Sequence, residues 1–297
     1  MSDALARLLE GVIDYAGLFP PAKLSMADSV AQYLQYRSGP ESWIVDRFAV
    51  TATRLDELRA ELTNREVGDP IPLTIIGTAG THEAWGDNLV QDAEAMTRFI
   101  ERAGDNADIE AYEIRLPRHE NIGEYVSDLR SFNQVDVFCE LPWSPAMPDS
   151  LGFIAEQEWL GVKARTGGLE AAAFPESKDV AVFLQQCVQL ELEFKLTAGL
   201  HHPFRAYRDE VQTKMHGFLN VLTALSMLMA HDLSAGEAST ILESEDPKAF
   251  TFKDGTVGFG EWTAGVDDID DARDLFVGFG SCSVQEPLDD LRSHNLI

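Results

Sequence analysis

Short apolar runs alternate with amphipathic stretches along most of the chain. The runs "GVIDYAGLF", "DRFAVTAT", "IPLTIIGTAG", "IEAYEIRLP" and "VDVFCELPW" are strand-like, and each precedes a stretch with helical spacing of its apolar residues, such as "DNLVQDAEAMTRFIERAG". Two further strand-like runs, "GVKARTGGL" and "EFKLTAGL", continue the alternation and are followed by predicted helices. The pattern therefore predicts repeated strand–helix units.

Eight such strand–helix units in 297 residues predict an α/β fold of the (β/α)₈ TIM barrel type. We expect one domain over 1–297, with an N-terminal helix and a C-terminal tail packed on the outside. The eighth strand is expected in "AFTFKDGTVGFG" and its helix in "DIDDARDLFVGFG", although Asp254-Gly255 is also typical of a hairpin turn. The run at 217–230 predicts a buried helix. An open doubly wound sheet is the alternative, but no G-x-G-x-x-G follows the first strand.

The alternation of side chains along each strand predicts which residues share a face. If the apolar faces pack against the helices, the opposite faces bring charged residues together near the carboxyl ends of the strands, where barrel active sites lie. These residues are Glu113, Arg115, Glu140, Lys163, Arg165 and Lys195. Mutual ion pairs without chemistry are one interpretation. Because each buried ion costs several kcal/mol of desolvation, we favour a functional one.

The two lysines, Lys163 and Lys195, lie on consecutive predicted strands. A lysine is a nucleophile only when its ammonium loses a proton, and burial or a neighbouring cation lowers its pKa. We therefore expect Lys163 and Lys195, with Arg165 adding positive field, to supply that arrangement together, and the residues alone leave open which of the two is the nucleophile.

The segments "KARTGG" and "KLTAG" resemble the two lysine motifs of the deoxyribose-phosphate aldolase type of class I aldolase. In that family a "K-x-S-T-G" strand carries the Schiff-base lysine, and a following "K-x-S-G-G" strand carries the lysine that perturbs it. The resemblance implies that Lys163 forms the Schiff base, that Lys195 activates it, and that Glu113 replaces the acidic proton carrier. It covers only these segments and the strand order. Arg165 stands where the motif has a small hydroxyl residue, and "GLHHPF" has no counterpart.

The resulting prediction is an aldolase or lyase that acts on a small polar carbonyl compound without a cofactor. Glu113 or Glu140 would move the proton, and Arg115 or Arg165 would hold a carboxylate-bearing substrate. Further substrate-binding residues are expected near the ends of the first and seventh strands: Tyr15, Thr197, Gly199, His201 and His202. The stretch "DYAGLFPPA", which puts Asp14 or Tyr15 near the end of the first strand, either closes over a ligand or packs against the rim of the barrel, and the sequence leaves both open.

Two other classes of function stay open from the sequence. A divalent metal held by Glu113, Glu140 and one of the histidines His201, His202 and His216 would make the protein a metal-dependent isomerase or lyase. No H-x-H or H-E-x-x-H spacing supports that alternative. The other alternative is a barrel that binds a small molecule without catalysis.

Composition removes several classes of partner. The net charge of −27 argues against binding to nucleic acid or to anionic lipid. No run of 18 apolar residues and no signal-peptide pattern is present, and the three cysteines have no metal-like spacing. We expect a cytoplasmic protein with a small-molecule substrate, and homo-oligomerisation stays open.

Overall fold

The computed structural model describes residues 1–63, 65 and 67–297. Within those residues, eight parallel strands close into a barrel in the order β1-β13-β7-β6-β5-β4-β3-β2. Their bounds are β1 (Ile13–Tyr15), β2 (Val45–Thr51), β3 (Ile71–Ile76), β4 (Ala107–Arg115), β5 (Asp136–Glu140), β6 (Leu160–Arg165), β7 (Phe194–Thr197) and β13 (Phe276–Ser281). The strands alternate with helices, which confirms the predicted (β/α)₈ fold.

By its internal contacts the chain divides into two compact units. The first unit is Ile13–Ala164, and the second combines Met1–Val12 with Arg165–Ile297.

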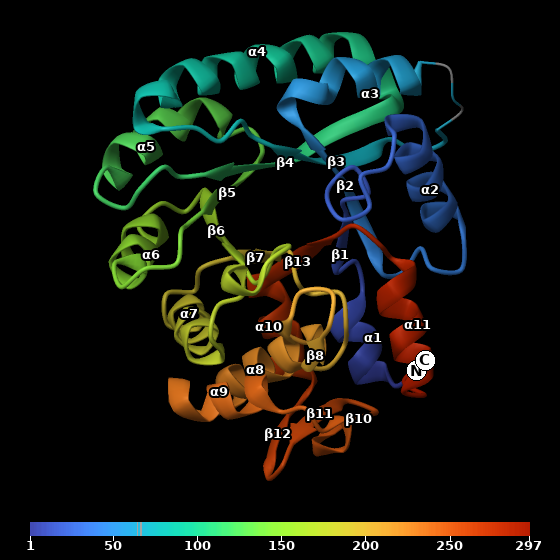
Figure 1. Ribbon diagram of the computed structural model, residues 1–297, viewed down its shortest axis with the longest axis vertical. Helices are drawn as coiled ribbons and strands as arrows, with labels where there is room; N and C mark the ends of the chain where they lie inside the picture. The colour runs from blue at the N-terminus through green and yellow to red at the C-terminus, as the bar shows by residue number, and fades with distance from the viewer. Residues whose placement is uncertain (64, 66) are drawn as a thin grey trace. The chain divides into compact units, whose positions relative to one another are not determined.

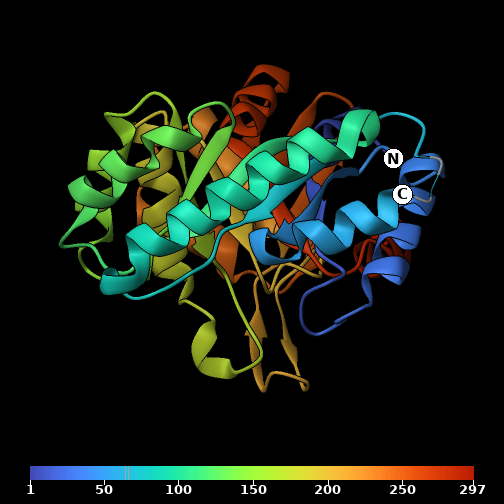
Figure 2. The same cartoon turned by 90° about the horizontal axis from the view of Figure 1, so that it is seen from above.

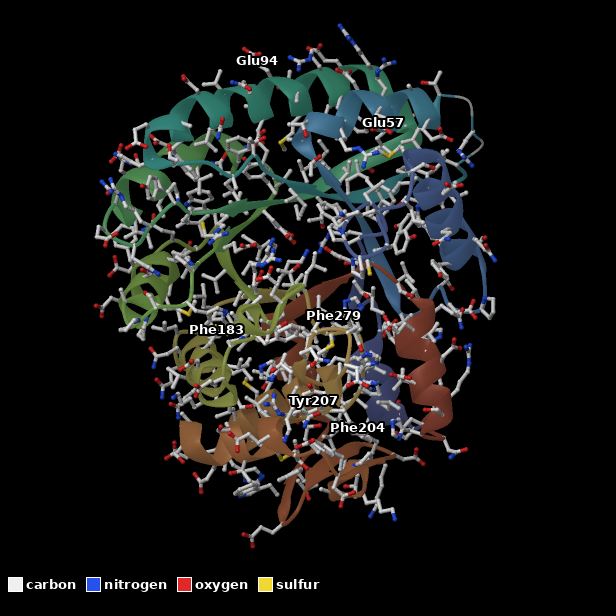
Figure 3. The ribbon with its side chains drawn as sticks, in the orientation of Figure 1. Glu57, Glu94, Phe183, Phe204, Tyr207 and Phe279 are labelled. Carbon is white, nitrogen blue, oxygen red and sulfur yellow. The ribbon has the colours of Figure 1, made fainter. Side chains whose placement is uncertain are left out.

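Helices cover one face of the strands in the first unit. They are α2 (Met26–Ser38), α3 (Leu55–Leu62), α4 (Trp85–Ala103), α5 (Ile122–Asp128) and α6 (Met147–Ala155). Figure 1 shows α3 and α4 running along the same side of β3 and β4. The helical period of α4 puts Leu89, Met96 and Phe99 on its buried side. Glu57 on α3 and Glu94 on α4, labelled in Figure 3, are exposed.

The second unit carries the remaining helices and two small sheets. Its helices are α1 (Asp3–Leu9), α7 (Ser177–Gln189), α8 (Phe218–Ala230), α9 (Ala235–Glu243), α10 (Val266–Leu275) and α11 (Gln285–Ser293). Residues Phe218 through Leu228 are all buried, which confirms the buried helix predicted at 217–230. The N-terminal helix is α1, and the C-terminal tail forms α11, which buries Leu288 and Leu291.

The predicted position of the eighth barrel strand is wrong, because a later segment of the chain forms that strand. The segment "AFTFKDGTVGFG" forms an antiparallel hairpin of β10 (Phe250–Lys253) and β11 (Thr256–Phe259), extended by β12 (Trp262–Ala264). Gly255 between the two strands has φ +74°, which favours glycine, so the Asp254-Gly255 turn decides the local structure. The eighth barrel strand is β13, which begins where α10 ends, inside the stretch that the spacing predicts to be helical.

A second hairpin interrupts the connection between β7 and α8. It consists of β8 (Ala206–Arg208) and β9 (Thr213–Met215), with Tyr207 opposite Lys214. Figure 2 shows this hairpin extending beside the loop that contains the short 3₁₀ helix Ala171–Ala173. His216, directly after β9, contacts that loop through a 2.8 Å hydrogen bond from Nε2 to the carbonyl oxygen of Pro175.

Across the described ranges, no helix combines the length and the hydropathy that a membrane span requires.

Candidate functional site

Three neighbouring strands of the first unit position the central charged residues. Glu140 on β5 lies in register with Arg115 on β4 and with Lys163 on β6. The opposite face of β4 packs against the helices: the ring of Tyr112 stacks on Phe132, and its hydroxyl donates to Asp92 of α4 over 2.7 Å. Strand alternation therefore places Glu113 on the face that carries Lys163, as predicted.

The cluster of Glu113, Glu140 and Lys163 is a buried ion triad. The Lys163 ammonium donates to Oε2 of Glu113 over 2.7 Å and lies 3.0 Å from Oε2 of Glu140. The three side chains are only 6%, 7% and 6% exposed for Glu113, Glu140 and Lys163. All three lie toward the carboxyl ends of their strands, the end at which barrel enzymes carry out their chemistry.

The pKa of Lys163 is raised, which is opposite to the lowered pKa that we expected from the sequence. Burial acts to lower this pKa, but the charges of Glu113 and Glu140 and their hydrogen bonds to the ammonium outweigh it. Lys163 is therefore an ammonium at neutral pH. Its pairing stabilises the fold fully below the unfolded-state pKa near 10.5, and the contribution is lost as pH rises through the higher folded-state pKa.

Arg115 connects the buried triad to solvent. Its Nε lies 3.9 Å from Oε1 of Glu140, while its side chain is 57% exposed. Glu140 therefore has a buried cation on one oxygen and an exposed cation near the other. An exposed guanidinium beside a buried acid–base cluster is suited to holding an anionic group.

Lys195 and Thr197 lie on β7, in the second unit. Lys195 is 1% exposed and is in register with Gly278 of β13. The rings of Phe183 and Phe276 pack on Phe194, so the alternation predicted for this strand is confirmed. The activating role of Lys195 stays a prediction.

The loop after β7 is held tightly by the loop after β6. Gly199 has φ +79°, and a Cβ there would lie 2.9 Å from the carbonyl oxygen of Thr166. The Thr166 hydroxyl donates to the carbonyl oxygen of Ala198 over 2.5 Å. Gly199 is thus explained by backbone conformation and close packing. Arg165, at the end of β6, is exposed.

His201 and His202 both pair with carboxylates of α11. His201 Nδ1 lies 3.1 Å from Oε2 of Glu286, and His202 Nδ1 lies 2.5 Å from Oδ2 of Asp290. This contact with His201 lowers the pKa of Glu286, although burial opposes the shift. The sequence gives no signal for these pairs, because their members are more than eighty residues apart, 88 in the case of His202 and Asp290.

Tyr15 does not have the position expected of a substrate-binding residue. It is fully buried among aromatic rings, including those of Tyr33 and Phe48, and its hydroxyl donates to Gln32 of α2 over 2.7 Å. Tyr15 therefore contributes to the aromatic packing of the first unit. Its neighbour Asp14 instead accepts a 2.7 Å hydrogen bond from the Thr74 hydroxyl and is 3% exposed, a buried polar contact that the sequence analysis missed.

The described residues contain no group of three or more His, Cys, Asp or Glu side chains placed to hold a metal ion. The metal-dependent alternative required such a group from Glu113, Glu140 and a histidine. A groove of about 670 Å³ does occur in the first unit, but it lies along α4 and is lined by residues such as Val90, Ala93 and Ser131. None of the predicted site residues lines that groove.

In comparisons with known proteins, no family model and no curated protein matches the chain. The geometry of the site must therefore carry the functional interpretation.

Proposed function

We propose that the buried triad of Glu113, Lys163 and Glu140 is the active site of an enzyme that acts on small polar carbonyl compounds. The observation that carries the proposal is the Lys163 ammonium held at 2.7 and 3.0 Å by two carboxylates toward the ends of barrel strands. Barrels of this type are commonly enzymes with their chemistry at that end. Stability alone does not explain the triad, since well-packed apolar residues often replace buried ion pairs without loss of stability.

Imine chemistry through Lys163 requires the ammonium to lose a proton first. Glu113 is placed to accept it over 2.7 Å, and exclusion of water by a bound substrate favours the neutral amine–acid pair over two desolvated charges. The amine then forms a C–N bond to the substrate carbonyl carbon. The carbonyl oxygen leaves as water, for which Glu113 returns the proton taken from the ammonium and the attacking nitrogen gives up a second proton by way of a carboxylate.

The resulting iminium withdraws electrons from the adjacent C–C bond. Cleavage requires a base to take the proton from the β-hydroxyl group, and Glu140 or Glu113 acts as that base. The electron pair of the broken bond passes into an enamine, which is protonated on carbon and hydrolysed to release the second product and free Lys163. The sequence resemblance to class I aldolases supports the same assignment. Aldolase or lyase chemistry is therefore the function that we propose.

The raised pKa of Lys163 favours a second candidate in the same site. An ammonium that keeps its proton stabilises a developing enolate oxygen, while one carboxylate removes the proton next to the carbonyl. The substrate class is the same, but no covalent bond to the protein forms.

Proton exchange next to a carbonyl tests the proposal in both forms. We expect the protein in D₂O to exchange the α-protons of at least one member of a panel of small hydroxy-ketones and 2-oxo acids, followed by ¹H NMR. Because Lys163→Gln removes the acid–base pair, the rate should fall by about 10²–10⁴-fold. Lys253→Gln, which changes an exposed lysine, should keep the wild-type rate. Exchange no faster than in buffer across the panel would contradict the proposal.

A further inference from the structure

Arg205 lies between β7 and β8 in the second unit, and buried polar groups fix its backbone. Its amide donates to Oδ1 of Asn220 over 3.0 Å. Asn220 is fully buried on α8 and donates in turn to the carbonyl oxygens of Ile241 and Ser244, over 2.8 and 2.9 Å. A fully buried amide is thus used to hold the main chain of one arginine.

The side chain of Arg205 is oriented by a second buried group. Its Nη1 donates to Nδ1 of His216 over 3.1 Å, and His216 is 1% exposed. Nε2 of His216 lies 2.8 Å from the Pro175 carbonyl oxygen, which can only accept, so Nε2 carries the hydrogen. Burial lowers the pKa of His216 to about 4, with the charge of Arg205 acting in the same direction. His216 is therefore neutral and accepts from Arg205.

Close packing holds His216 and Asn220 in this arrangement. A Cβ at Gly217, between them, would lie 2.5 Å from Cα of Phe204 and 2.5 Å from the carbonyl oxygen of Pro203. Figure 3 labels Phe204 and Tyr207 on either side of Arg205 in the chain, and Tyr207 is 51% exposed. Arg205 thus lies between the buried residues His216 and Asn220 and a hairpin that is accessible to solvent.

Arg205 has no carboxylate partner among the residues that the structure describes. The chain carries 50 acidic and 23 basic residues, and other arginines, among them Arg47, Arg54 and Arg65, do pair with acids. The nearby Glu245 is engaged by Lys214. Burial lowers the pKa of Arg205, and the charges of Glu245 and Glu243 offset this only in part. A partly buried guanidinium with donors to spare is suited to an external anion.

We propose that Arg205, positioned by His216, binds the carboxylate or phosphate group of a small-molecule ligand. The planar guanidinium presents paired N–H donors that match either anion, and holding Nη1 on His216 leaves the other nitrogens to make those contacts. Asn220 and His216 act through Arg205 and are positioning residues. The test of this site is independent of the imine proposal for Lys163, because ligand binding is measured without turnover.

Titration calorimetry with malonate and, separately, with inorganic phosphate tests this site. We expect the wild-type protein to bind at least one probe saturably at a single site, and the tighter probe identifies the anion. Arg205→Gln should weaken binding by about tenfold or more, and Arg205→Lys by less, because a charge without paired donors remains. Arg102→Gln removes an exposed arginine at the end of α4 and should leave the affinity within about twofold of wild type.

His216→Ala separates positioning from simple stability. It should weaken the same probe about three- to tenfold at a temperature where circular dichroism shows the variant fully folded, because the guanidinium loses its orientation. The proposal is overturned if neither probe binds wild-type protein saturably, or if Arg205→Gln binds as tightly as wild type. An unchanged affinity in folded His216→Ala would overturn the positioning role.

Discussion

Replacing Lys163 with methionine is expected to lower the free energy of unfolding by about 3–5 kcal/mol at pH 7, the cost of removing one partner from a buried ion cluster. The ammonium now balances Glu113 and Glu140, both almost fully buried. Without it, two desolvated carboxylates share one site, and the pKa of at least one must rise. Urea unfolding followed by circular dichroism measures the loss.

The dependence of that loss on pH distinguishes charge from packing. A carboxylate whose folded-state pKa is raised keeps its proton in the folded protein, so the penalty is small near pH 4.5 and grows as pH rises through the raised pKa. Lys163→Met combined with Glu113→Gln and Glu140→Gln should recover much of the stability at pH 7, and Lys253→Met should change little. A Lys163→Met penalty that is the same at pH 5 and pH 8 would contradict the charge balance described for the triad.

Replacing Lys163 with arginine is expected to lower kcat/KM in the α-proton exchange assay by about 10³-fold or more, equivalent to about 4 kcal/mol of transition-state stabilisation. Arginine keeps a positive charge between Glu113 and Glu140 but cannot act as an amine nucleophile, since its guanidinium stays protonated. The free energy of unfolding should therefore fall much less than in Lys163→Met.

The same variant separates the two candidate chemistries. If the ammonium only stabilises an enolate, the arginine cation should preserve part of that stabilisation, and the loss should be about 10- to 100-fold. Lys253→Arg serves as the control at an exposed position. Activity within a factor of two of wild type in Lys163→Arg would exclude a catalytic role for the residue.

The alternation of strands and helices could be predicted from the sequence because each element carries its own local pattern. The runs around Glu113, Glu140 and Lys163 form strands as expected, and side-chain alternation puts the three residues on one face. The eighth strand could not be identified in the same way. "FVGFGS" directly follows α10 without a break in apolar spacing, whereas β10 and β11 have the clearer strand composition.

The pKa of Lys163 could not be predicted from the sequence, because it depends on distances between side chains that no local sequence pattern contains. The sequence favoured a lowered pKa for Lys163 because it places other cations nearby along neighbouring strands. In the structure the carboxylates at 2.7 and 3.0 Å dominate instead. The pairs of His202 with Asp290 and of Arg205 with His216 likewise form through loops and helices that pack together only in the folded chain.

Borohydride reduction in the presence of small aldehydes, ketones and 2-oxo acids, followed by intact mass and peptide mapping, tests the proposed imine most directly. We expect a covalent adduct on the peptide that contains Lys163, absent in Lys163→Arg and present in Lys253→Arg. An adduct that maps to Lys195 would contradict the assignment of Lys163 as the nucleophile. If a compound undergoes rapid α-proton exchange with the protein yet leaves no adduct, imine chemistry is contradicted and the non-covalent mechanism takes its place.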